Sequence, residues 1–416
     1  MIGLLACLAL GITPAIQADR PAPEPASESA LEPVVQEPLV QEPGAEPGST
    51  GPALRGVPDR MGREAIQSTL DQALGWLVEA QNEDGSFGSG ALEGVLEMGF
   101  AVETYSNWQY AAHGLALVAL LEVPESEAVL EVLEKAIRWL DQRREPRRGS
   151  HWDVDYTWSA LYGLVASAAV ASDERFADGP LGEAMERVGR TSWKILKRNE
   201  VPSGGWAYYD DPPFTARPTW ATSFCTALVL PALKQAERLG WIDQSESSRR
   251  ALVTLQRAHL PTGAYTYNAS DGVQRIQAGE SINNVKGSLG RIQVANWARA
   301  AVGDKTMTLD VMREGLELFF EHHKFLDIAR MRPIPHEAYY ANAGYFYLFA
   351  HFYAAQVIEL LPREEREDFH ARLRPHLAKI QEANGSTVDF LGTSYTRTAG
   401  TAMTVYALSI GLGSDE

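Results

Sequence analysis

The residues best suited to chemistry lie in one short segment, His151 to Trp158, which reads His-Trp-Asp-Val-Asp-Tyr-Thr-Trp. Asp153 and Asp155 are separated by one residue, and the apolar run that follows predicts a helix over 156–170. Asp often caps a helix, because its carboxylate accepts from the free N–H groups of the first turn. The segment is therefore open to two interpretations: a helix cap, or a carboxylic acid that protonates a substrate.

Aromatic side chains are frequent near the predicted starts of several helices. Aromatic faces stabilise cations and contact apolar ligands, although aromatic residues also fill ordinary cores. We expect some of them to line a substrate site. The candidates are Trp108, Trp152, Trp158, Trp206, Tyr209, Trp220 and Tyr340.

A metal site is the next possibility, because zinc takes nitrogen and sulfur ligands. His113, Cys225 and His351 fall in three separate apolar segments that predict buried helices. A lone buried cysteine usually behaves as a small hydrophobe, so hydrogen-bonded core histidines are the preferred interpretation. We therefore expect no metal and no cofactor. If a metal is bound, these three residues are the candidate ligands. His322 and His323 are expected to lie in a solvated outer helix.

Composition excludes several classes of protein. The 416 residues include 54 acidic and 37 basic side chains, which give a net charge of −17. This balance argues against nucleic-acid binding, which needs a basic surface. With only Cys7 and Cys225, neither a disulfide scaffold nor a four-cysteine zinc site is possible.

The first sixty or so residues differ in composition from the rest. Residues 1–18 are uncharged and apolar, which predicts a signal peptide and export to the periplasm or the extracellular space. A lipid anchor at Cys7 and an uncleaved anchor are the alternatives, so membrane contact is expected only through this segment. Residues 19–62 hold five Glu-Pro pairs and predict a disordered, extended tether.

The remaining chain, 63–416, repeats a unit of about sixty residues. Gln81, Gln142, Gln256 and Gln381 mark the repeat, and each copy combines a charged helix, a glycine-containing loop and a more apolar helix. One helical hairpin cannot bury its apolar face alone, but six can close into a ring with the apolar helices inside. The sequence therefore predicts an all-α domain, an α6/α6 toroid. The predicted inner helices cover 106–121, 156–170, 220–239, 289–302, 339–361 and 398–412.

The repeat resembles the QW motif of the terpenoid cyclase and protein prenyltransferase toroids, which include squalene–hopene-cyclase-like proteins. Its best copies are Gln81 to Phe87, Gly204-Gly205-Trp206 and Gln381 to Gly385. The resemblance covers roughly residues 65–412 and implies a terpenoid-cyclase-like fold. It also implies that the glutamine and the aromatic residue tie the loop to a helix, with the amide satisfying free carbonyls at a helix C-terminus and the ring covering the joint.

The resemblance also implies a role for the Asp153–Asp155 segment. Class II terpene cyclases begin an inner helix with Asp-x-Asp-Asp-Thr, whose middle aspartic acid protonates an alkene or epoxide. Asp153, Asp155 and Thr157 match this motif, and Tyr156 replaces its last aspartate. The resemblance thus implies a catalytic site of Asp153, Asp155 and Tyr156. Because a neighbouring acid would offset the helix's preference for the charged form, the tyrosine predicts a less potent acid.

Three functions follow as hypotheses. The first is an isoprenoid-processing enzyme, an isomerase or lyase of the class II cyclase type, with a hydrophobic isoprenoid-like partner in the central cavity. The second is a non-catalytic exported toroid that binds a ligand or protein partner. The third is a carbohydrate-active lyase or hydrolase, for which Asp155 with Asp210 or Asp211 is the candidate carboxylate pair. A central cavity filled by side chains would favour the second hypothesis, the non-catalytic toroid.

Overall fold

The computed structural model describes residues 61–97, 100–143, 155–208, 218–243, 246–269 and 280–413. These ranges contain thirteen α-helices, four short 3-10 helices and no strand. The predicted signal peptide and nearly all of the tether lie outside the described residues, as do Trp152, Asp153, Tyr209, Asp210 and Asp211. Among the described helices, none combines the length and the hydropathy that crossing a lipid bilayer requires.

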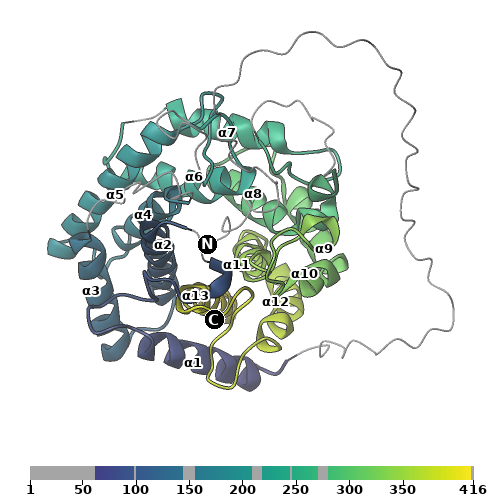
Figure 1. The fold of residues 1–416 in the computed structure, drawn as a ribbon. Helices are drawn as coiled ribbons and strands as arrows, with labels where there is room; N and C mark the ends of the chain where they lie inside the picture. The colour runs from purple at the N-terminus through teal and green to yellow at the C-terminus, as the bar shows by residue number, and fades with distance from the viewer. Residues whose placement is uncertain are drawn as a thin grey trace, which may run out of the picture.

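Six helices form an inner ring in which each helix packs on the next one (Figure 1). The last inner helix also packs against the first, so the ring is closed. The predicted α6/α6 toroid is confirmed. The inner helices are α2 (Val102–Leu121), α4 (Thr157–Val170), α6 (Ser223–Arg238), α8 (Leu289–Ala301), α11 (Phe346–Ile358) and α13 (Ser394–Gly413).

The outer layer surrounds this ring (Figure 1). Its helices carry most of the charged residues found in the helices. These outer helices are amphipathic. By contrast, the inner helices α4 and α11 contain no Asp, Glu, Lys or Arg, and nearly all of their residues are buried. The outer helices are α1 (Arg63–Glu79), α3 (Glu127–Gln142), α5 (Pro180–Asn199), α7 (Glu246–Ala258), α9 (Leu309–Glu321), α10 (Lys324–Ala329) and α12 (Arg363–Ala378). The short α10 was not predicted. The 3-10 helices cover Val95–Glu97, Glu280–Asn283, Val285–Gly287 and Tyr339–Ala341.

Two predicted inner helices begin later than expected. The third begins at Ser223 because the side chain of Thr222 accepts from the Cys225 N–H and caps the helix. The fifth begins at Phe346, because Tyr340 and Ala341 have φ of 58° and 52°, which a right-handed helix does not tolerate.

The motif glutamines join successive units of the ring. The Gln81 amide donates to the carbonyl of Gly85 in its own loop at 3.1 Å and to that of Val132 in α3 at 2.8 Å. Gln381 donates in the same way to Gly385 and to Thr69 of α1. The glutamines therefore bind the middle of the next outer helix, and Gln381 closes the sixth unit onto the first.

The glutamine amides therefore donate to carbonyls inside a helix and not, as expected, to the free carbonyls at a helix C-terminus. In the third unit an aromatic residue satisfies such a carbonyl. The Trp206 indole N–H donates at 2.8 Å to the carbonyl of Leu196, in the last turn of α5. That carbonyl has no partner within its own helix, so the indole satisfies it. Trp206 is fully buried at this joint.

The fourth unit has a histidine where the motif has glutamine. Gln81 and Gln381 each form an isolated β-bridge with the residue six positions later, and His259 forms the same bridge with Tyr265. Gln256 lies inside α7 and donates instead to Asp304 at 3.1 Å. Gln256 was thus assigned to the wrong position of the repeat.

Candidate functional site

The predicted acid Asp155 lies just before α4, at the N-terminal end of the inner ring, with 1% of its surface exposed. Its Oδ2 accepts from the indole N–H of Trp108, in α2, at 3.0 Å. The Trp108 ring stacks on Tyr395 of α13, with centroids 5.5 Å apart. The structure thus brings together one predicted acid and one predicted aromatic residue. A hydrogen-bond donor and a nearby helix N-terminus both favour the ionised carboxylate.

A second buried carboxyl group, Glu97, lies beside the same aromatic pair. Its carboxylate accepts from the Tyr395 hydroxyl, and the Tyr105 hydroxyl donates to its backbone carbonyl at 2.6 Å. Burial raises the pKa of Glu97 to about 7. Sequence reasoning missed this residue, because it lies in a short 3-10 helix and belongs to no motif. Glu97 and Asp155 are therefore connected through Tyr395 and Trp108.

Tyr156, predicted beside the acid, makes a hydrogen bond toward the outer layer. Its hydroxyl donates at 2.6 Å to Oδ1 of Asn199, whose own amide donates to the Ile195 carbonyl at 2.8 Å. This arrangement joins the start of α4 to the end of α5. A tyrosine at this position thus has a structural contact that accounts for it.

The N-terminal half of the ring interior is filled with aromatic side chains. Trp158 of α4 stacks on Tyr208 at 6.0 Å and on Phe224 of α6 at 6.3 Å. Phe224 in turn meets Phe346 and Phe349 of α11 edge-on. All five residues are buried. Because these rings contact one another across the ring of helices, the predicted aromatic wall is a packed core in this part of the molecule.

The remaining described aromatic candidates lie in other surroundings. Trp220 is partly exposed and faces Tyr267, with centroids 6.4 Å apart. Tyr340 packs edge-on against Phe325 and accepts from the Lys286 ammonium at 3.2 Å. Neither contact involves the Asp155 carboxylate.

A buried cation, Arg291 in the first turn of α8, also faces this end of the ring. Its guanidinium lies 5.4 Å from the Tyr267 centroid and 6.0 Å from that of Phe346, and it donates to the Tyr265 carbonyl at 3.2 Å. Burial lowers the pKa of Arg291 to about 10, so it stays charged at neutral pH. Arg291 therefore already lies over two aromatic rings, those of Tyr267 and Phe346, at the end of the ring where a carbocation would need such faces.

An open chamber lies at the opposite, C-terminal end of the inner helices. Its volume is about 460 Å³, and its walls are mainly apolar and aromatic. Every inner helix contributes to it, so it is the axial hollow of the toroid. One lining residue from each inner helix in chain order is Leu115, Val165, Leu228, Trp297, Phe352 and Tyr406.

Polar side chains surround the mouth of this chamber. Burial and the like charge of Asp173 raise the pKa of Glu122, whereas hydrogen bonding to Arg175 lowers the pKa of Asp173. The Gln235 amide donates to the Ser172 hydroxyl at 2.6 Å, bridging α6 and the end of α4. The chamber thus has an apolar interior and a polar rim.

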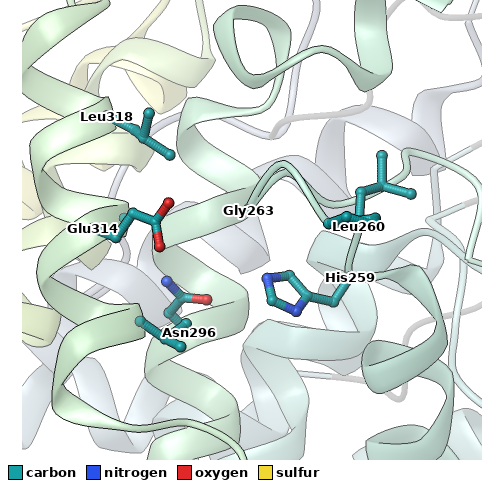
Figure 2. Close-up of a pocket in the computed structure, with 9 residues that line it drawn as sticks. His259, Leu260, Gly263, Asn296, Glu314 and Leu318 are labelled. Atoms are coloured by element: carbon teal, nitrogen blue, oxygen red, sulfur yellow. The ribbon is translucent and has the colours of Figure 1, made fainter.

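A smaller hollow of about 310 Å³ lies in the outer layer, between the end of α7 and α9 (Figure 2). His259, Asn296 and Glu314 point into it (Figure 2). It occurs where the motif glutamine of other units reaches the next outer helix. The shorter imidazole of His259 leaves this space unfilled, and its buried Nε2 has no hydrogen-bond partner among the described residues.

The three residues considered as metal ligands do not form a common cluster among the described residues. His113 bonds the Ala136 carbonyl at 3.0 Å, and burial lowers its pKa to about 3. Burial raises the pKa of the Cys225 thiol, which disfavours a thiolate. His351 lies instead beside His323. The expectation that His323 is solvated is wrong, because it is 3% exposed where α9 meets α10.

Comparison with known proteins gives matches to solved structures only, since no family model and no curated protein matches the sequence. A possible GH105 family member from Salmonella enterica serovar Paratyphi A has a TM-score of 0.53 at 12% identity, covering 88% of this chain and 98% of that one. A GH76 α-mannanase from Bacteroides thetaiotaomicron has a TM-score of 0.52 at 10% identity, covering 84% and 97%.

The type II terpene cyclase MstE from Scytonema matches with a TM-score of 0.48 at 13% identity, covering 85% of this chain and 98% of that one. At such identities a likeness establishes the fold and not the reaction. The protein has the α/α-toroid fold, as do the possible GH105 family member and the GH76 α-mannanase.

Proposed function

We propose that the protein binds an apolar, isoprenoid-like small molecule in the axial chamber at the C-terminal end of the inner ring. The observation that carries this proposal is the composition of the chamber wall, to which all six inner helices contribute apolar or aromatic side chains. Its volume of about 460 Å³ lies in the range of small-molecule sites. Binding would follow export, which residues 1–18 predict.

The chamber suits an amphiphile with one polar end. Val118, Val165 and Leu228 offer apolar surface, and burying such surface contributes about 25 cal/mol per Å². Burial raises the pKa of Tyr162 and Tyr406, so both hydroxyls stay neutral. The hydroxyl or other polar end of the ligand would lie at the rim, where water and charged side chains solvate it.

Displacement of an environment-sensitive apolar dye tests the proposal. Farnesol and geranylgeraniol should displace the dye from the wild type, and a soluble oligosaccharide should not. Val165→Trp, which fills the chamber from α4, should weaken isoprenoid binding at least about tenfold, whereas Val78→Trp on the outer helix α1 should not. Equal affinities for the two variants, or binding of the oligosaccharide instead, would contradict the proposal.

A second candidate function is acid–base chemistry at the N-terminal end of the ring. The specific observation is the pair of buried carboxyl groups, Asp155 and Glu97, connected through Trp108 and Tyr395. Asp155 would act as the acid that the Asp-x-Asp motif implies, on an alkene or a glycoside. The aromatic packing around Trp158 and the charge of Arg291 make this the second choice.

Product analysis separates the two functions. Linear isoprenoids and unsaturated oligosaccharides are incubated with the wild type, Asp155→Asn and Glu97→Gln, and the products are identified by mass. Products that only the wild type forms would support acid–base chemistry. The binding proposal predicts that all three proteins bind isoprenoids equally, because neither carboxyl group lines the chamber.

A further inference from the structure

Three histidines meet between the inner and outer layers, away from the axial chamber. His323 precedes α10, His351 lies in α11, and His376 lies in the last turn of α12. Helix α11 packs against both α10 and α12 (Figure 1). One ring nitrogen from each histidine lies within 4.8 Å of the others. The described residues contain no other such group of potential ligands.

The outer nitrogens of two of these rings face groups that can only accept a hydrogen bond. Nδ1 of His323 lies 3.1 Å from a carboxylate oxygen of Asp327, and Nδ1 of His351 lies 2.7 Å from the carbonyl oxygen of Tyr347. The Asp327 carboxylate also accepts a hydrogen bond from the Lys379 ammonium. Each Nδ1 must therefore carry the proton of its ring.

This tautomer leaves a lone pair on each Nε2, and the two Nε2 atoms face each other at 3.0 Å. Two lone pairs at this separation repel unless a cation lies between them. The contact is also enclosed by protein, since His351 is fully buried and His323 nearly so. A metal ion resolves the conflict while both rings stay neutral.

The third ring supplies a further nitrogen without a partner. His376 packs against His323, with ring centroids 3.6 Å apart, and its buried Nδ1 has no hydrogen-bond partner among the described residues. A metal bond would give this buried nitrogen the partner that it lacks. The His376 side chain is partly exposed, so an ion can reach the cluster from solvent.

We propose that His323, His351 and His376 bind a divalent transition-metal ion, with Zn²⁺ the best fit, that joins the fifth and sixth units of the toroid. Three imidazoles with an open fourth position form a known type of zinc coordination. Two nitrogens on one tetrahedral Zn²⁺ lie about 3.3 Å apart, so the observed pair needs to widen by only a few tenths of an ångström. Asp327 and the Tyr347 carbonyl would fix the ring orientations, as outer-shell partners do.

The test uses the full-length protein, stripped with a chelator and then titrated with Zn²⁺ alone in a calorimeter. Metal content after dialysis is measured by mass spectrometry, and Co²⁺ substitution gives a visible spectrum that reports nitrogen ligands. The wild type should bind one Zn²⁺, and its thermal unfolding temperature should rise with Zn²⁺ concentration. His351→Gln and His376→Gln should lose this binding, and Asp327→Asn should weaken it by about 10- to 100-fold.

His259→Gln is the matched control, because this partly buried histidine lies outside the cluster. It should bind Zn²⁺ like the wild type. If His351→Gln does not fold, the partly exposed His376 still provides the decisive variant. Failure of the wild type to bind any of Zn²⁺, Co²⁺ or Ni²⁺ stoichiometrically, or unchanged binding by His376→Gln, would overturn the proposal. In that case a proton shared by His323 and His351 accounts for their contact.

Discussion

The indole N–H of Trp108 donates to the Asp155 carboxylate at 3.0 Å, across the joint between α2 and α4. Both residues are buried. The hydrogen bond satisfies the indole and favours the charged form of the acid, so it stabilises the joint and opposes proton donation. This contact gives Asp155 a structural role whatever its part in chemistry.

Substitution of Asp155 separates these roles. Asp155→Ala removes the acceptor and leaves the Trp108 N–H buried, which should lower the free energy of unfolding by about 1–3 kcal/mol. Asp155→Asn retains an acceptor oxygen and should cost less. Urea unfolding of the three proteins measures the difference. If both substitutions lower the free energy of unfolding by the same small amount, the hydrogen bond contributes little and the structural account of Asp155 fails.

A pH dependence of stability follows from Asp389. This buried carboxylate accepts from the Leu348 N–H in the first turn of α11 at 2.8 Å, and burial raises its pKa to about 7. An exposed aspartate has a pKa of about 3.9, so between these values the folded state binds the extra proton. Protonated Asp389 therefore favours the folded state at low pH. As the pH rises toward about 7, the free energy of unfolding falls by up to about 1.4 kcal/mol per pH unit.

Asp389→Asn isolates this contribution, because the amide retains an acceptor for Leu348 and does not titrate. The free energy of unfolding of the variant minus that of the wild type should rise as pH increases from about 4 to about 7. Unfolding curves at several pH values give this difference, in which other titrating groups such as Glu97 cancel. A difference that stays flat with pH would show that the carboxyl group titrates normally.

The motif position of the fourth unit offers a gain of stability. His259→Gln should let the new amide reach α9 as Gln81 reaches α3, adding a hydrogen bond across the outer hollow and raising the free energy of unfolding by about 0.5–1.5 kcal/mol. The reverse change, Gln81→His, should lower it by a similar amount. Thermal unfolding of both variants checks the pair. Shifts of the same sign would show that the two positions are not equivalent.

The fold was predictable because its signals are periodic. The apolar runs that became α4 and α11, and the glycine loops near Gly85 and Gly385, recur at a regular spacing that indicates repeated helical hairpins. The loop glycines are positions where backbone conformation decides the residue: φ is 87° at Gly85 and 88° at Gly385, and a Cβ at either would collide with the next outer helix.

The site was less predictable, because it depends on which side chains converge across the ring. Asp155 and Trp108 were singled out separately, and only the packing of α2 on α4 joins them. Glu97 and Arg291 have no motif spacing and become notable through burial. His323 was expected to be solvated because it was assigned to an outer helix, but it lies in the turn between α9 and α10 and is buried.

Photo-crosslinking with a diazirine-bearing farnesol analogue tests binding in the axial chamber most directly, because peptide mapping locates the adduct. The account predicts labelling of the C-terminal halves of inner helices, at residues such as Leu115, Val165 and Phe352, and competition by unlabelled farnesol. Val165→Trp should reduce the labelling and Val78→Trp should not. Labelling confined to the N-terminal end, around Tyr208 and Trp220, or insensitive to competitor, would contradict the account.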